Sequence, residues 1–318
     1  MADGRDVNHR EFTREDARNV LRNRSNWGRW GADDEMGAVN LITPEKRVQA
    51  ASLVRSGRSV SLSRPFPKEP AANVPKPGLH FVDTEDHAPG GAVVDFYGIS
   101  YHGMGCTHID SLCHVWAEDG IYNGRKPQDV IGFKGATFGQ IDNWRDGIVT
   151  RGVLLDVPLF RGTSYVTQDE PVHGWELEEI CRANGLQVTP GDALVIYSGR
   201  EAWGQEQGRL WGSASPAAAA GSPLVRPGLH ASCLEFIRET DAAVLVWDMM
   251  DMMPNGLDLP WSVHAAIFAF GVALVDNALL EPLAGICAQE NRTDFMFVTS
   301  PLRVEGGTGS PANPLAIL

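Results

Sequence analysis

Residues 193–197, Ala-Leu-Val-Ile-Tyr, form a short and wholly apolar run. A run of this length and composition predicts a buried β-strand. Similar runs occur at 152–157 and 242–247, and helical patterns near 174–184 and 229–239 alternate with them. Apolar strands that alternate with helices indicate an α/β protein with a mixed or largely parallel sheet.

The same pattern extends toward both ends of the chain. Thr43 and Pro44 predict the start of a helix that ends by Gly57, because a hydroxyl caps the first turn and proline suits its first position. A helix near 261–270 precedes two further strand candidates, at 271–275 and 295–298.

Proline- and glycine-rich segments predict loops between these elements. We expect residues 64–92 to be an extended surface loop and residues 213–223 to be another. We divide the chain into an N-terminal arm (1–25), one domain (26–304) and a C-terminal tail (305–318) without regular structure.

Composition limits the classes of partner. The 318 residues carry a formal net charge of −13 and no basic run, which argues against nucleic acid and anionic membrane surfaces. No apolar stretch reaches the ~18 residues of a membrane span, and the N-terminus lacks an apolar signal core. Five cysteines without paired spacing fit reduced thiols, so we expect a cytoplasmic protein.

Residues 107–114, Thr-His-Ile-Asp-Ser-Leu-Cys-His, contain the candidate metal-binding side chains. In an extended segment, His108 and Asp110 point the same way with Cα atoms about 6.6 Å apart, so both side chains can reach one cation. Imidazole and carboxylate suit Zn²⁺, Mn²⁺ or Fe²⁺ in a hydrolytic site. His114 borders the same pocket if the chain turns after Asp110. The alternative is a strand whose histidines only form hydrogen bonds in the core.

These residues resemble the central motif of the cyclase family of metal-dependent hydrolases, which includes bacterial kynurenine formamidase, isatin hydrolase and trans-dienelactone hydrolase. That motif reads His-x-Gly-Thr-His-x-Asp-x-Pro-x-His, and Thr107, His108, Asp110 and His114 match it. A second family signature, a histidine followed twelve residues later by an acid, is similar to His264 and Asp276. Further segments resemble the longer subgroup of roughly 300 residues, at 26–31, 40–44, 227–230 and 248–254.

The first histidine of the motif is replaced here by Met104. His102 comes two residues too early and would lie ~20 Å from His108 in a straight strand. Gly103 and Gly105 permit a tight turn that would bring His102 back as a replacement ligand; packing is the alternative. Thioether sulfur suits Zn²⁺ or Mn²⁺ poorly, so we expect Met104 to line the pocket.

The resemblance implies roles for individual residues. His108, Asp110, His264 and Asp276, with His102, would bind the metal, and His114 and His264 would be catalytic. Alternatives stay open: His264 as a core residue, Asp276 as a turn cap, and His114 as a group that orients Asp110. We place Met104, Cys106, Trp116 and His230 at the pocket. A nucleophilic role for Cys106 or Cys113 is disfavoured, since the Cys113 and His114 side chains should face opposite ways in an extended run.

By resemblance we expect a single β-rich α/β domain with a mixed sheet and flanking helices, of the kynurenine formamidase type (swivelling β/β/α), as a homodimer or larger homo-oligomer. The leading hypothesis is a hydrolase that uses one or two Zn or Mn ions and a metal-activated water. Its substrate would be an amide, imide or lactone in a small cyclic or aromatic molecule. The alternatives are a polyketide-type cyclase or dehydratase that works by proton transfer, and a metal-free small-molecule-binding protein with a decayed site.

Overall fold

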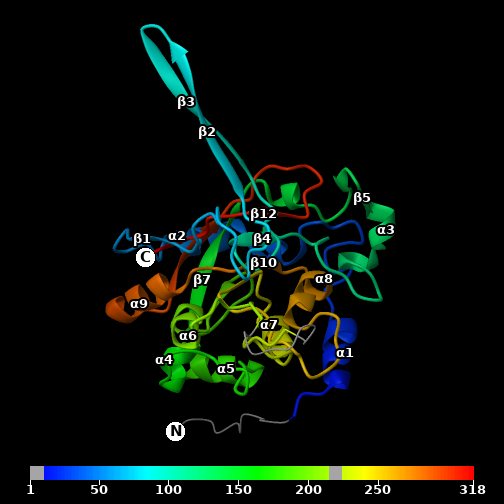
Figure 1. Cartoon of the computed structure of the whole chain (residues 1–318). Coiled ribbons are helices and arrows are strands. Elements are labelled where there is room, and N and C mark those ends of the chain that lie inside the picture. The colour runs from blue at the N-terminus through cyan, green and yellow to red at the C-terminus, as the bar shows by residue number, and fades with distance from the viewer. Residues whose placement is uncertain (1–10, 215–223) are drawn as a thin grey trace.

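A nine-stranded mixed sheet forms the centre of the molecule, in the order β1-β13-β11-β7-β8-β9-β10-β4-β12 (Figure 1). This computed structural model describes residues 11–214 and 224–318. Strands β7, β8, β9 and β10 run parallel to one another, and the remaining neighbours pair antiparallel. The strands are β1 (Ser59–Ser61), β4 (His108–Asp110), β7 (Ile148–Asp156), β8 (Ala193–Tyr197), β9 (Val244–Trp247), β10 (Ala273–Asp276), β11 (Asp294–Thr299), β12 (Gly309–Pro311) and β13 (Leu315–Ile317).

The three apolar runs of the sequence are β7, β8 and β9, in the middle of this sheet. Every residue of β8 and β9 is buried, which explains why these strands are apolar on both faces. The mixed α/β fold predicted from the sequence is therefore confirmed.

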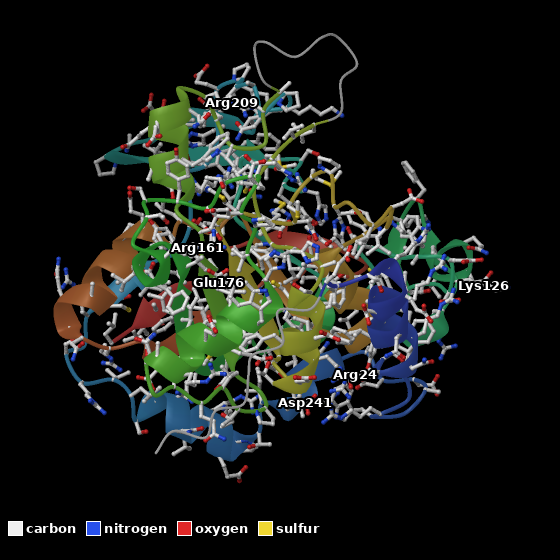
Figure 2. The ribbon with its side chains drawn as sticks, turned by 90° about the horizontal axis from the view of Figure 1, so that it is seen from below. Arg24, Lys126, Arg161, Glu176, Arg209 and Asp241 are labelled. Atoms are coloured by element: carbon white, nitrogen blue, oxygen red, sulfur yellow. The ribbon has the colours of Figure 1, made fainter. Side chains whose placement is uncertain are left out.

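Helices surround the sheet. Thr43 caps α2 as predicted, by accepting a hydrogen bond from the Lys46 backbone N–H, but α2 ends at Ala51, well before Gly57. Arg161 at the end of α4 pairs with Glu176 in the first turn of α5 at 2.6 Å, which ties the two helices together (Figure 2). The helices are α1 (Arg14–Asn23), α2 (Pro44–Ala51), α3 (Pro127–Val130), α4 (Val157–Arg161), α5 (Gly174–Ala183), α6 (Arg200–Gln207), α7 (Cys233–Glu239), α8 (Ala266–Phe270) and α9 (Glu281–Glu290), with 3-10 turns η1 (Gly37–Leu41), η2 (Tyr122–Gly124), η3 (Ile141–Trp144) and η4 (Val263–Ala265).

The C-terminal segment differs from the expectation of a tail without regular structure. Residues 305–318 supply β12 and β13, two strands of the central sheet. Both strands are only three residues long, and their pairing with β4, β1 and β11 decides their conformation. Such short segments carry too little local pattern to be recognised before their partners are known.

The expected loop at 64–92 also differs, because its second half begins a long hairpin. Strands β2 (Leu79–His87) and β3 (Gly90–Gly98) pair along nine residues and project away from the body (Figure 1). All of these residues are exposed except Gly98, which is half-buried. A smaller hairpin joins β5 (Ile131–Gly132) and β6 (Gly135–Ala136).

The predicted surface loop at 213–223 lies mostly outside the described residues, which end at 214 and resume at 224. Within the described part of the chain, no helix is long and apolar enough to cross a membrane.

Candidate metal centre

The pairing of β4 with β10 places three acidic and imidazole side chains on one face of the sheet. The antiparallel register sets His108 opposite Asp276 and Asp110 opposite Leu274. Because directly paired residues, and residues two apart in a strand, point to the same face, His108, Asp110 and Asp276 converge. His108 Nε2 lies 3.5 Å from Asp110 Oδ1 and 3.7 Å from Asp276 Oδ2. All three side chains are buried.

His102 reaches the same place through a reversal of the backbone. Gly103 adopts φ +153°, and a Cβ at Gly105 would lie 2.2 Å from Val74, so the chain turns and packs closely at the two glycines. His102 Nδ1 lies 2.9 Å from Asp110 Oδ1. The turn thus overcomes the separation that a straight strand would impose between His102 and His108.

His114 lies beside this group. A turn at Ser111, whose carbonyl accepts a hydrogen bond from the His114 N–H at 3.1 Å, bends the chain back after β4. His114 Nε2 lies 3.7 Å from Asp110 Oδ1, and its ring stacks on His102 with centroids 3.8 Å apart. The side chain is 22% exposed, so part of it reaches solvent.

His264 approaches from η4. Its Nε2 lies 3.3 Å from Asp276 Oδ2, and its Nδ1 forms a short contact with Asp251 Oδ2. The other oxygen of Asp276 accepts a hydrogen bond from the indole N–H of Trp247. His108 is oriented in the same manner, since its Nδ1 donates to the Cys106 carbonyl at 2.8 Å and leaves Nε2 facing the group.

Four buried atoms of this cluster have no hydrogen-bond partner among the described residues: His102 Nδ1, His108 Nε2 and both carboxylate oxygens of Asp110. His102 and Asp110 lie close, but without the alignment of a hydrogen bond. An unsatisfied buried polar atom costs about 1–3 kcal/mol, so four at one point indicate a missing common partner.

Two sets of three residues have the spacing of metal ligands: His102, His108 and Asp110, and Asp110, His264 and Asp276. Within each set, the ligand atoms lie within 4.8 Å of one another, and Asp110 belongs to both. Imidazole nitrogens and carboxylate oxygens suit Zn²⁺ or Mn²⁺, so the residues present fit such an ion.

Burial and neighbouring charges set the protonation of these groups. Burial lowers the pKa of His102 to about 4, and burial together with the neighbouring imidazoles lowers that of His114 to about 3. Burial raises the pKa of Asp110 to about 7. Burial also opposes a charge on His264, but Asp251 and Asp276 outweigh it and raise its pKa well above the ordinary value. His102 and His114 are therefore neutral near pH 7, with a lone pair to offer.

The predicted pocket residues occupy different places. Met104 and His102 line one cavity of about 320 Å³, and the Met104 carbonyl accepts a hydrogen bond from Arg200 at 2.6 Å. Cys106 is buried, which raises the pKa of its thiol to about 11, so it is protonated. Trp116 is 49% exposed and lines a separate hollow.

His230 lies in a second imidazole cluster. Its Nδ1 is 3.1 Å from Ser232 Oγ, which also lies 3.2 Å from His173 Nδ1. The ring of Phe12 contacts His230 edge-on. These polar and aromatic contacts of His230 are separate from the cluster around Asp110.

Asp251 and Trp247, the partners of His264 and Asp276, were not among the predicted site residues. A signal was available, since Asp248 follows the buried strand β9 directly and Asp251 comes three residues later. Polar residues at the carboxyl ends of parallel strands are typical of sites in α/β sheets.

The fold and this cluster define a mixed α/β protein with a candidate His/Asp metal centre at one side of the sheet. The model of the family described as "Putative cyclase" matches residues 60–252. The chain belongs to this cyclase family, as the resemblance implied.

Solved structures share the fold. A protein whose crystal structure is described as that of a novel cyclase is 30% identical in sequence to this chain. The match covers 92% of this chain and 97% of that chain, with a TM-score of 0.77. Isatin hydrolase A from Labrenzia aggregata, bound to benzyl benzoate, is 17% identical, with 85% and 97% covered and a TM-score of 0.59. An isatin hydrolase bound to the product analogue thioisatinate is 13% identical, with 87% and 99% covered and a TM-score of 0.58. No curated protein matches.

Proposed function

We propose that this protein is a metal-dependent hydrolase that opens an amide, imide or lactone bond in a small cyclic or aromatic substrate. The observation that carries the proposal is the group of four unpartnered buried atoms on His102, His108 and Asp110. Isatin hydrolases share the fold of this chain, which supports the proposal of a hydrolase. Among hydrolases, we favour an enzyme of the arylformamidase type, which acts on C–N bonds.

His102, His108, Asp110, His264 and Asp276 would hold one or two ions of Zn or Mn. A divalent cation here would lower the pKa of a water molecule and polarise the substrate carbonyl. Asp251 and the Trp247 indole would keep His264 and Asp276 in position. His114 would accept a proton from the attacking water through the lone pair of its neutral ring, because its Nε2 lies 3.7 Å from Asp110 Oδ1. Its lowered pKa means that this proton would be passed on to the leaving nitrogen or oxygen and not retained.

The first test combines elemental analysis with turnover of a panel of cyclic amides, imides and lactones. We expect near-stoichiometric Zn or Mn in the wild-type protein, and loss of both metal and turnover in His108→Ala and Asp110→Ala. His87→Ala is the matched control, since His87 is 69% exposed on the hairpin. A wild-type protein that takes up no added metal would contradict the proposal, as would an active double variant with a folded circular dichroism spectrum.

Isotope labelling separates hydrolysis from the cyclase or dehydratase alternative. Hydrolysis in ¹⁸O-enriched water places one ¹⁸O atom in the product carboxyl group, whereas ring closure by proton transfer incorporates none. Tight ligand binding without metal or turnover would instead favour the metal-free binding protein.

We also propose that the chain forms a homodimer or larger homo-oligomer through the β2/β3 hairpin. An isolated two-stranded hairpin is marginally stable in water. Here the large apolar side chains of the hairpin are between 40% and 64% exposed: Leu79, Phe81, Val82, Val93, Val94, Phe96 and Tyr97. A second copy of the same chain would cover them by two-fold pairing. All five cysteines are free thiols, which fits our proposal of a cytoplasmic location.

A further inference from the structure

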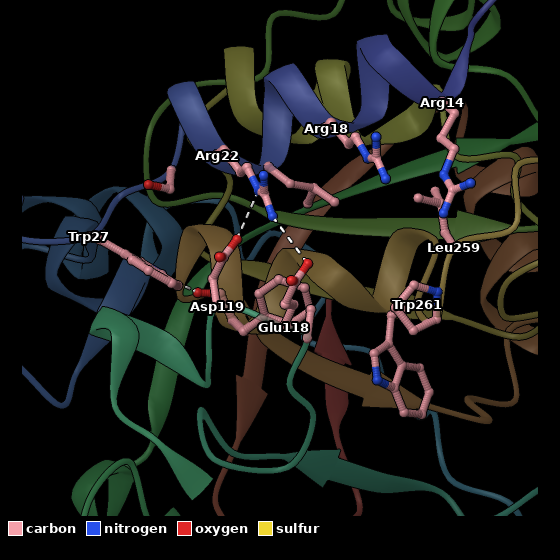
Figure 3. Close-up of a pocket in the computed structure, with 13 residues that line it drawn as sticks. Arg14, Arg18, Arg22, Trp27, Glu118, Asp119, Leu259 and Trp261 are labelled. Carbon is pink, nitrogen blue, oxygen red and sulfur yellow. Dashed lines mark hydrogen bonds and ion pairs between the residues drawn. The ribbon is translucent and has the colours of Figure 1, made fainter.

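A second cavity lies between α1 and the segment that leads into η4 (Figure 3). Its volume is about 420 Å³, within the range of sites for small ligands. Its apolar wall consists of Leu21, Trp27, Leu259, Trp261 and Phe268. The wall adjoins the candidate metal centre, because the Trp261 ring lies 5.5 Å from that of His264.

One face of α1 gives this cavity a cationic edge. Arg14, Arg18 and Arg22 follow one another at four-residue spacing, so they share a face of the helix. Arg14 pairs with Asp258 at 3.2 Å, and Arg22 pairs with Asp119 at 2.9 Å. These two guanidinium groups are therefore engaged by carboxylates of the protein itself.

Arg18 differs from its two neighbours. Within residues 11–214 and 224–318, no hydrogen bond or ion pair engages its guanidinium group, which lies at the exposed rim and points toward the cavity (Figure 3). In a chain with a formal net charge of −13, this leaves one unpaired positive charge beside a tryptophan-lined hollow.

We propose that this cavity binds a small organic monocarboxylate with a flat apolar body, held by Arg18 at its acid group and by Trp261 at its ring. The planar guanidinium fork matches a carboxylate with two parallel hydrogen bonds, and aromatic walls suit a flat body. A doubly charged phosphate fits less well, because Arg18 is the one arginine of these three without a carboxylate partner among the described residues, and the nearby Glu118 and Asp119 would repel a second negative charge.

The site goes beyond the proposed hydrolysis, and binding to it can be measured without turnover. Opening of a cyclic amide or lactone yields a carboxylic acid, so the product of the proposed reaction is one ligand of this class. That link alone rests on the proposed function; the affinity of Arg18 for a carboxylate does not.

Calorimetric titration at neutral pH tests the proposal, with sodium benzoate, its neutral analogue benzamide, and inorganic phosphate as probes. We expect benzoate to bind more tightly than benzamide or phosphate, in both the purified and the EDTA-treated protein. Arg18→Gln should weaken benzoate binding by about tenfold or more and leave benzamide binding unchanged. Arg14→Gln is the matched control, with a smaller loss expected because Asp258 already engages Arg14.

Four results would overturn the proposal. Equal affinity for benzoate and benzamide, or tighter binding of phosphate, would remove the carboxylate preference. Benzoate binding that vanishes with EDTA would belong to the metal centre instead. Arg18→Gln with wild-type affinity and an unchanged melting temperature would show that Arg18 does not bind the acid. None of these results depends on hydrolysis.

Discussion

Asp251 controls how His264 is presented to the candidate metal centre. One of its carboxylate oxygens accepts backbone hydrogen bonds from Val263 and His264, and the other contacts the imidazole Nδ1. These contacts fix η4 and leave Nε2 directed at Asp276. A carboxylate in this position fixes the tautomer of a ligand histidine and raises its basicity.

We therefore predict that Asp251→Asn weakens Zn²⁺ binding by roughly 10- to 100-fold, the usual loss when such a partner is removed. Competition with a chelating dye measures the affinity. Asp258→Asn is the control, because Asp258 is 91% exposed and lies seven positions away. Unchanged affinity in a folded Asp251→Asn protein would assign Asp251 a purely structural role.

The second histidine cluster makes stability depend on pH. Burial, then the nearby His173, lowers the pKa of His230 to about 4 from its ordinary value of 6.5. The unfolded chain therefore takes up this proton first as the pH falls. The contribution of His230 is fully present above pH 6.5 and is lost as the pH falls toward 4.

We predict that the free energy of unfolding falls less steeply between pH 6.5 and pH 4 in His230→Gln than in the wild type. After allowance for partial solvent exposure, the difference is about 1–2 kcal/mol. Urea titrations across this pH range measure it. Parallel curves for the two proteins would mean that His230 is protonated equally in both states.

At the scale of elements, the C-terminal strands show how late residues complete the sheet. Strand β13 lies between β1 and β11, and the Leu318 carbonyl accepts a hydrogen bond from the Gly57 N–H at 2.7 Å. Ala316 and Leu318 are 0% exposed. The end of the chain is thus part of the core.

Leu318→Ala should accordingly lower the free energy of unfolding by about 2–4 kcal/mol, as for other buried leucines. Leu302→Ala is the control, because Leu302 is 48% exposed and its truncation should change stability by less than about 0.5 kcal/mol. Chemical denaturation measures both values. Equal losses for the two variants would contradict the placement of Leu318 in the core.

The register of β4 against β10 positions side chains of the candidate metal centre. It sets His108 opposite Asp276, and a slip by one residue would turn Asp276 to the other face of the sheet. The spacing of His108 and Asp110 could be interpreted from sequence, since it lies within one strand. The approach of Asp276 depends on its pairing with His108, which lies 168 positions earlier in the chain, and no local pattern encodes that pairing.

At the scale of the whole molecule, the β2/β3 hairpin is exposed along its length, and the rest of the described chain contacts it near its base, where Tyr97 meets Phe66. Phe81 and Phe96 are paired across the hairpin, with ring centroids 6.1 Å apart, and both remain about 60% exposed. The hairpin leads directly into residues 99–106, which line the cavity beside His102. Contact with a second copy would therefore also brace this part of the site.

We predict a solution mass of at least twice 34.6 kDa for the wild-type protein, and the monomer mass for the double variant Phe81→Ser/Phe96→Ser. Light scattering coupled to size-exclusion chromatography measures both. Asp86→Ser, a polar exposed position of the same hairpin, should leave the mass unchanged. A wild-type monomer at micromolar concentrations would contradict the proposed oligomer.

Local sequence determined much of this protein. The apolar runs at β7, β8 and β9, the Thr43 cap, and the i, i+2 placement of His108 and Asp110 depend on neighbours within a few positions. Local sterics and burial therefore suffice to predict them. The family resemblance predicted that His264 and Asp276 belong to the same site. Both lie too far from His108 along the chain for residue spacing to predict this.

Only the tertiary structure decided the rest. The turn at Gly103 that returns His102 to Asp110, the contact of Asp251 with His264, and the strands formed by residues 305–318 all depend on partners distant in sequence. The physical reason is the same in each case. A hydrogen bond, an ion pair or a strand pairing needs both partners in place, and the fold alone brings them together.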